Sequence, residues 1–320
     1  MKEVWDKIED LRYKPDMKVK DLVGDFDRLG FQSIQVHRAV ELIKEMKKDN
    51  AKIVFTFTSN MVTSGLRGLF AQLIEMKFVD VVITTVGSIE EDFIKAHGNK
   101  FVIGEYHVND TKLSAKGLNR VGNIYIPTDS YIDFEKNVRP ILEKMYAGKK
   151  IWTSAEVIRE LGKNVKDKNS ILYQAYKNNV EIHCPAIMDG ALGIQLASFQ
   201  MEHPDFKVDC VQDLNAIINE FFDYKKIGCI VLGGGVPKHY AILSSILRDG
   251  MDYAVYITTA SPYSGSASGA STDEARSWGK LKGTANAVTV HGEASIVFPL
   301  VIFKALDDLK FSKKTKAKKN

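Results

Sequence analysis

The stretch Cys229-Ile-Val-Leu-Gly-Gly-Gly-Val-Pro-Lys-His239 decides the fold class. Its first four residues are apolar at consecutive positions, and Val81-Val82-Ile83 shows the same pattern earlier in the chain. Strands that are buried on both faces of a parallel sheet have this pattern, whereas half-exposed strands alternate apolar and polar residues. The glycines that follow predict a tight turn from a strand into a helix. The stretch therefore predicts one strand–turn–helix unit of a parallel α/β sheet.

Similar units recur along most of the chain. Further strands are expected at residues 53–57, 79–86, 101–103, 123–126, 180–183, 253–258 and 288–290. Apolar residues at helical spacing predict helices near residues 66–74, 157–161, 214–222 and 242–247. The capping box Thr153-Ser-Ala-Glu156 opens the second of these helices. This alternation predicts an α/β fold with a doubly wound, mostly parallel sheet.

We find no internal repeat and no linker rich in Pro, Gly or Ser. A single large domain is therefore expected over residues 51–309, after a helical N-terminal extension over residues 1–50. Six lysines lie within residues 310–320. We expect this lysine-rich tail to be disordered, and the alternative is that it contacts RNA or an acidic partner.

Charge and composition exclude several classes of protein. The 320 residues carry a formal charge of +4 from 44 basic and 40 acidic residues, and without the tail's six lysines the 38 remaining basic residues give −2. The first residues are charged throughout, and the longest apolar run is 294–303, so neither a signal peptide nor a membrane span of about 20 residues is expected. The spacing of cysteines and histidines indicates no disulfide framework and no bound metal. We therefore expect a cytoplasmic protein.

Ligands of doubly wound sheets bind beyond the carboxyl ends of the strands. The segments that follow the expected strands are rich in Gly, Ser, Thr or Asp: 58–60, 84–87, 185–193, 233–235 and 258–260. Glycines 233–235 suit a phosphate, because helix N-termini offer N–H groups, although a plain turn explains them equally well. Their spacing matches neither a dinucleotide fingerprint nor a P-loop.

Two short motifs each allow two interpretations. The acids Glu90-Glu-Asp92 could cap a helix at residues 93–97, or they could bind a ribose or a cationic substrate. In Ser277-Trp-Gly-Lys280, a lysine stands beside an aromatic residue. A lysine that is desolvated in this way can attack an imine or carbonyl carbon, whereas an ordinary surface lysine is the simpler interpretation.

Taken together and in order, these segments resemble deoxyhypusine synthases. The resemblance spans about residues 20–305, and the combination of motifs is far more specific than any single one. The matching stretches are Thr58–Asn60 with Ser64-Gly65, Asp80–Gly87, Glu90–Asp92, Arg120–Asn123, Pro185–Gly190, Leu232–Gly235 with Lys238-His239, Asp252–Tyr256, Ser277–Lys280 and Val297–Leu300.

The resemblance implies a Rossmann-like fold and a homotetramer whose active sites lie between paired subunits. It also implies NAD as the cofactor and spermidine, or a related polyamine, as the amine donor. In this family the butylamine group passes to an enzyme lysine as an imine and then to one lysine of the translation factor 5A precursor. The same nicotinamide returns the hydride that it removed.

Residue by residue, the resemblance makes Lys280 the nucleophile that forms the imine. The residues that it implies for NAD are Ser59, Asn60, Met61, Val62, Thr63, Thr85, Val86, Gly87, Glu91, Asp189, Gly234, Thr259, Ala260, Glu293 and Ala294. The residues that it implies for the polyamine are Glu90, His239, Gly265, Ser266, Glu274 and Trp278. Carboxylates and an aromatic face suit a chain of ammonium groups.

Two departures from the family pattern bear on the amine donor. Ile194 stands where many family members carry an aspartate near the polyamine, and Ala267 stands where some members do. Each exchange removes a charge-assisted hydrogen bond of about 1.5–3 kcal/mol. A homospermidine synthase, or another aminoalkyl transferase acting on small amines, is therefore the alternative. A non-catalytic protein that binds nucleotides or RNA is the third interpretation, although nucleic acid is not the expected partner.

Overall fold

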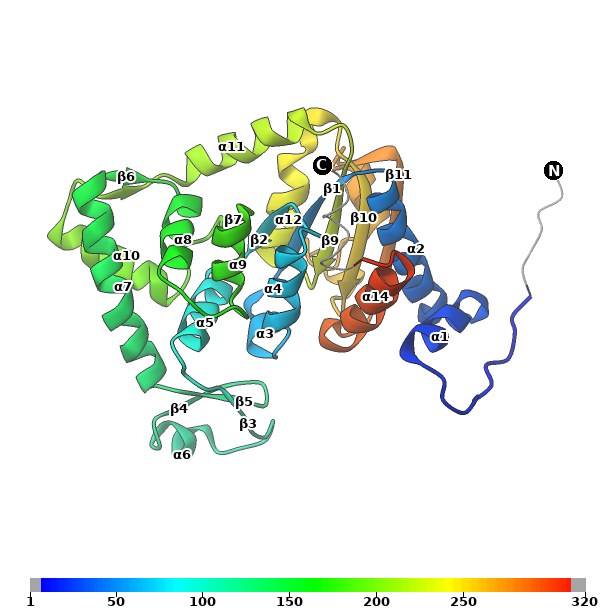
Figure 1. Ribbon diagram of the computed structural model, residues 1–320, viewed down its shortest axis with the longest axis horizontal. Helices are drawn as coiled ribbons and strands as arrows, with labels where there is room; N and C mark the ends of the chain where they lie inside the picture. Colours follow the sequence, from blue (N-terminus) through cyan, green and yellow to red (C-terminus); the bar gives the residue numbers. More distant parts are fainter. Residues whose placement is uncertain (1–6, 312–320) are drawn as a thin grey trace. The chain divides into compact units, whose positions relative to one another are not determined.

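The computed structural model describes residues 7–311, so the lysine-rich tail beyond Phe311 lies outside the described part of the chain (Figure 1). Contacts group these residues into two compact units. The first unit comprises residues up to 53 together with those from 221 onward, and the second comprises residues 54–220. The domain boundaries expected at residues 50 and 309 stay predictions.

The first unit contains three parallel strands in the order β11-β10-β9, which lie side by side in Figure 1. Its elements are α1 (Val19–Gly24), η1 (Asp25–Arg28), α2 (Gln32–Lys48), β9 (Ile227–Leu232), α12 (Gly235–Ser244), η2 (Ile246–Arg248), β10 (Met251–Thr258), η3 (Pro262–Ser264), α13 (Thr272–Ser277), β11 (Leu281–His291) and α14 (Ala294–Asp308). All six residues of β9 are buried. This burial is what the consecutive apolar residues predict for a parallel strand with both faces covered.

The second unit contains three parallel strands in the order β1-β2-β7. Its elements are β1 (Lys52–Phe57), α3 (Ser59–Thr63), α4 (Arg67–Glu75), β2 (Val81–Thr84), α5 (Val86–Ala96), β3 (Val102–Ile103), α6 (Asp110–Ser114), β4 (Leu118–Val121), β5 (Ile124–Pro127), α7 (Asp129–Gly148), β6 (Ile151–Trp152), α8 (Ser154–Lys163), α9 (Ile171–Asn178), β7 (Glu181–His183), α10 (Ala191–Glu202), β8 (Lys207–Val208) and α11 (Cys210–Asp223). The capping box predicted at Thr153 is confirmed at the start of α8.

The predicted mixed α/β class with parallel strands is confirmed, but two expected strands belong elsewhere. The strands near residues 101–103 and 123–126 form a separate antiparallel sheet, β3-β5-β4, which Figure 1 shows beside α6. A two-residue turn, Gly122-Asn123, joins β4 to β5. Such a turn reverses the chain and imposes antiparallel pairing, whereas parallel strands need a longer crossover.

The helix expected to continue to Leu247 ends earlier, at Ser244. The hydroxyls of Ser244 and Ser245 donate to the carbonyls of Tyr240 and Ile242, and the short η2 follows. Serine side chains that bond to the backbone in this way compete with continued α-helix. Within residues 7–311, no helix is both long enough and apolar enough to cross a bilayer.

Asp92 of α5 connects three helices of the second unit. Its carboxylate accepts a hydrogen bond from Arg67 Nε of α4 at 2.5 Å and from the N–H groups of Ile171 and Leu172, at 3.0 and 2.9 Å, where α9 begins. The Ser170 hydroxyl donates to the same carboxylate at 2.6 Å. Because the Asp92 side chain is fully buried, these partners supply the hydrogen bonds that water would otherwise make.

We expect the Asp92→Asn substitution to lower the free energy of unfolding by about 3 kcal/mol, because it leaves the buried Arg67 guanidinium short of one anionic partner. Asp167, 2.8 Å from Arg67 Nη1, keeps the loss from being larger. Chemical denaturation monitored by circular dichroism measures the change. Asp133→Asn, which removes an exposed ion pair with Lys136, is the control and should leave stability nearly unchanged. Equal losses in the two variants would contradict this role of Asp92.

Candidate active site

Lys280 is positioned by its own backbone. Its N–H donates to the carbonyl of Ala275 at 3.0 Å, and its carbonyl accepts from the Met251 N–H at 3.1 Å and from the Ser245 hydroxyl at 3.2 Å. The residue therefore stands between α13 and β11, at the amino end of the strand. The segments in which ligand-binding residues were expected follow the opposite, carboxyl ends of the strands. The residue pattern of those segments alone could therefore not locate Lys280.

The Lys280 amine faces the imidazole of His239 from α12. Nζ lies 3.3 Å from His239 Nε2 and 5.4 Å from the centre of the Trp278 ring. Burial, followed by the positive charge of Lys280, lowers the pKa of His239. The imidazole is therefore neutral at pH 7, and a neutral ring nitrogen can accept a proton from the ammonium group.

A cavity of about 290 Å³ opens around this pair. Its lining includes five of the residues predicted from the resemblance: Gly265, His239, Glu274, Trp278 and Lys280. Predicted Ser266 is a neighbour in the sequence and lies on the surface, where its hydroxyl contacts that of Ser264. Ala267, one of the two departures from the family pattern, also lines the cavity. The cavity thus offers one carboxylate, Glu274, and one aromatic face to a cationic chain.

Lys238 is a further charged residue of this cavity, and the sequence motifs did not indicate it as a site residue. Its side chain is 1% exposed, and Nζ donates to the carbonyls of Ala270 at 2.6 Å and Ser268 at 3.3 Å. Burial lowers the pKa of Lys238 to about 8. The lysine therefore holds the loop that closes one side of the cavity. No periodicity or spacing reveals that this lysine is buried while the adjacent His239 is partly exposed.

The remaining predicted residues of the first unit follow the carboxyl ends of its three strands. Gly234 precedes α12, Thr259 and Ala260 follow β10, and Glu293 and Ala294 follow β11. The Glu293 side chain already has a local role, because it accepts the N–H of Ile296 at 3.2 Å and caps α14. This arrangement fits the rule that ligands of parallel sheets bind at carboxyl strand ends.

In the second unit, the segments that follow β1 and β2 lie against each other. Ser59 and Thr63 belong to α3, whereas Thr85 is the N-cap residue of α5, which begins with Val86 and Gly87. The Ser59 N–H donates to the Thr85 hydroxyl at 3.0 Å. A Cβ atom on Gly87 would lie 2.8 Å from the Cβ of Ser59, so only glycine permits this close approach. Of the other predicted residues, Met61 and Val62 are buried, while Asn60 and Asp189 are exposed.

The three consecutive acids Glu90, Glu91 and Asp92 do not cap a helix at residues 93–97, because α5 begins seven residues earlier, at Val86. That expectation is wrong. Each acid instead has a different partner: Glu90 accepts the N–H of Leu192 at 2.7 Å, where α10 begins, and Glu91 accepts the Thr63 hydroxyl at 2.6 Å. Burial raises the pKa of Glu90, and it raises that of Glu91 to about 7.

Comparison with known proteins identifies the family. The deoxyhypusine synthase family matches residues 21–305 of this chain. A probable deoxyhypusine synthase of Thermoplasma acidophilum is 39% identical over 297 residues, which cover 92% of this chain and 96% of the relative. A deoxyhypusine synthase of Musa acuminata is 39% identical over 315 residues, covering 88% of this chain and 84% of the relative.

A crystal structure of a candidate deoxyhypusine synthase from Entamoeba histolytica has the same fold. It gives a TM-score of 0.66 at 27% identity and covers 93% of this chain and 96% of that one. The fold and the relatives define an enzyme of the transferase class. The chain belongs to the deoxyhypusine synthase family.

The raised pKa of Glu91 predicts a pH dependence of stability. Below about pH 4.5 the carboxyl is protonated in both the folded and the unfolded chain. Between about pH 4.5 and 7 the unfolded chain loses this proton while the folded chain keeps it. The free energy of unfolding should therefore fall as the pH rises through this window, by on the order of 3 kcal/mol from this group.

Glu91→Gln should remove that decline, and denaturation curves recorded from pH 4.5 to 7 measure it. Glu135→Gln, which replaces an exposed acid on α7, serves as the matched control and should keep the decline of the unmodified protein. An identical slope in the protein with Gln at position 91 would show that Glu91 is ionised throughout.

Proposed function

We propose that this protein uses NAD to transfer the aminobutyl group of spermidine to a lysine of the translation factor 5A precursor, through an imine on Lys280. The observation that carries the proposal is the pairing of the Lys280 amine with a neutral His239 imidazole at 3.3 Å. Family membership supports the same activity. A covalent amine nucleophile needs a nearby base to remove its proton, and this pair meets that need.

The residues of the second unit have the chemistry to hold NAD. Glu91 and Thr63 offer a buried acceptor and a hydroxyl for ribose, and Gly87, which has no side chain, would let a phosphate approach the backbone. The family resemblance also assigns Gly234, Ala260 and Glu293, at the strand ends of the first unit, to NAD binding. When bound, NAD accepts a hydride from the amine donor and later returns it.

The cavity beside Lys280 suits a polyamine. Glu274 offers a carboxylate to an ammonium group, and the face of Trp278 favours cations. Lys238, which also lines the cavity, would repel a cation. Attraction to Glu274 and Trp278 together with repulsion from Lys238 would favour one direction of the amine chain in the cavity. Glu90, whose carboxylate accepts a backbone N–H, would add negative charge in the second unit.

The chain's own residues can carry the transfer steps. The Lys280 amine attacks the imine carbon of the oxidised donor, a C–N bond forms to Nζ, and the second C–N bond breaks to release the diamine that remains. His239 takes the proton from Nζ and gives it to the departing nitrogen. The acceptor lysine then displaces Lys280 by the same exchange, which leaves an imine on the acceptor. A bound NAD would supply the hydride that reduces this imine, so no net oxidation would occur.

We further propose that the protein works in the cytoplasm as a homotetramer with active sites between paired subunits, as the family resemblance implies. A second candidate function is aminoalkyl transfer between small amines, as in homospermidine synthesis. The observation that favours it is Ala267 in the lining of the cavity, where a carboxylate would otherwise help select spermidine.

The direct test is transfer of labelled butylamine from spermidine to purified factor 5A precursor in the presence of NAD. We expect transfer by the unmodified protein and at least a 10³-fold loss with Lys280→Arg, because a guanidinium cannot act as the nucleophile. Lys225→Arg, an exposed lysine of the same unit, is the control and should retain full activity.

Putrescine added to the same assay separates the two candidate functions. Homospermidine formed without modification of the factor would favour the second candidate. No transfer to either acceptor would contradict both.

The lowered pKa of His239 predicts the pH profile of the reaction. If neutral His239 is the base, the lowered pKa keeps the ring neutral at pH values above the ordinary imidazole pKa of about 6.5, so kcat should fall only on the acid side of that pH. His239→Gln should lower kcat by about 10²–10⁴-fold and abolish this acid limb. His107→Gln, at an exposed position of the second unit, should leave the profile unchanged. An acid limb that persists in the protein with Gln at position 239 would assign the base to another group.

A further inference from the structure

We propose that Glu181, His183 and Glu220 bind a divalent transition-metal ion, with Zn²⁺ as the expected occupant. The three residues belong to the second unit, where β7 is the edge strand. The spacing of cysteines and histidines in the sequence predicts no metal site. It could not reveal this one, because Glu220 comes from α11, far from β7 along the chain.

The backbone places the three ligands together. Glu181 and His183 are separated by one residue on β7, and side chains two apart point to the same face of a strand. Glu220 approaches this face from α11, and one ligand atom from each residue lies within 4.8 Å of the other two. His183 Nε2 is 3.8 Å from Glu181 Oε1. Bonds of about 2.0–2.2 Å to zinc require slightly shorter separations, which small rotations of the two glutamates supply.

His183 has the properties of a metal ligand. Its side chain is 1% exposed, and its Nε2 lies beside the Glu181 carboxylate. A neutral imidazole is the form that donates a lone pair to a metal ion.

The surroundings of Glu181 carry an excess of negative charge. The negative charges of Glu220 and Asp213 lie close to its carboxylate, while the positive charge of Arg159 has a smaller opposite effect. The Asp213 carboxylate is already committed to α8, because it accepts the N–H groups of Ser154 at 2.6 Å and Ala155 at 3.2 Å. A cation bound here would offset the repulsion between the carboxylates of Glu181 and Glu220.

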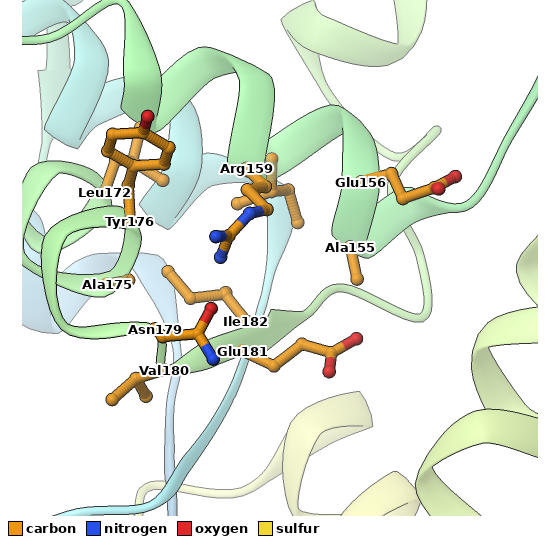
Figure 2. Close-up of a pocket in the computed structure, with 11 residues that line it drawn as sticks. Ala155, Glu156, Arg159, Leu172, Ala175, Tyr176, Asn179, Val180, Glu181 and Ile182 are labelled. Atoms are coloured by element: carbon orange, nitrogen blue, oxygen red, sulfur yellow. The ribbon is translucent and has the colours of Figure 1, made fainter. Parts of the chain in front are cut away.

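The ligand set selects among metals. One imidazole and two carboxylates suit Zn²⁺ or a neighbouring transition metal, whereas Ca²⁺ and Mg²⁺ prefer oxygen ligands alone. Three protein ligands leave a coordination position for water. Glu181 also lines a cavity of about 190 Å³, and Figure 2 shows its side chain extending from the strand below Arg159 and Ala155. A bound ion would join β7, which leads into the segment that carries Asp189, to α11.

Titration of the chelator-treated full-length protein with Zn²⁺, in competition with a chromophoric chelator, tests the proposal. We expect one tightly bound ion per chain, at least a tenfold weaker affinity for Glu181→Gln and for Glu220→Gln, and Mg²⁺ binding at least 100-fold weaker than Zn²⁺. Asp223→Asn changes an exposed acid on the same helix and should leave the affinity unchanged. Because these glutamates are not fully buried, their variants should fold, and circular dichroism verifies this.

The absorption spectrum with Co²⁺ identifies the ligands independently. Visible bands without thiolate charge transfer, unchanged in Cys210→Ser, would support a site made of nitrogen and oxygen ligands. A thiolate band, the absence of binding, or equal affinity in both glutamate variants and the unmodified protein would each overturn the proposal. Transferase activity is measured separately, so failure of this proposal leaves the function assigned to Lys280 untouched.

Discussion

The hydrogen bonds that hold the backbone of Lys280 are the constraint on which the candidate active site depends. Ala275 accepts its N–H, and its carbonyl accepts hydrogen bonds from Met251 and Ser245. Gly250 packs against the same peptide and has a φ of +88°, which favours glycine. A Cβ atom at this position would lie only 2.8 Å from the Lys280 carbonyl carbon, so there is no space for a side chain. These contacts fix the Cα position from which the flexible Lys280 side chain extends. Nζ can remain beside His239 with little loss of conformational entropy on reaction.

Much of the fold could be predicted from local patterns. Consecutive apolar residues locate β2 and β9 because both faces of these strands are buried. The same patterns misplaced β3 and β5, whose apolar residues resemble those of the parallel strands although β3 has only two residues and is exposed. Their pairing direction is decided by the turn at Gly122-Asn123. The helix expected to reach Leu247 stopped at Ser244 because serine hydroxyls bond to the preceding turn, a competition that apolar periodicity does not register.

Only those residues of the candidate site that belong to recognisable sequence motifs could be predicted. Lys280, His239, Glu274 and Trp278 were reached through the resemblance, and the structure brings them to one cavity. The buried state of Lys238 and the separate partners of Glu90 and Glu91 depend on contacts between segments distant in sequence. For the same reason, spacing rules cannot find a cluster such as Glu181, His183 and Glu220, to which β7 and α11 both contribute.

The central claim is that the Lys280 amine carries the transferred group. Borohydride trapping in the presence of NAD and labelled spermidine, followed by peptide mass spectrometry, tests this claim most directly. Reduction converts the imine into a stable secondary amine on the lysine that formed it. The account predicts the aminobutyl label on Lys280 alone, even though the buried Lys238 lines the same cavity and has a lowered pKa. Label on Lys238, or on no lysine of an active preparation, would contradict it.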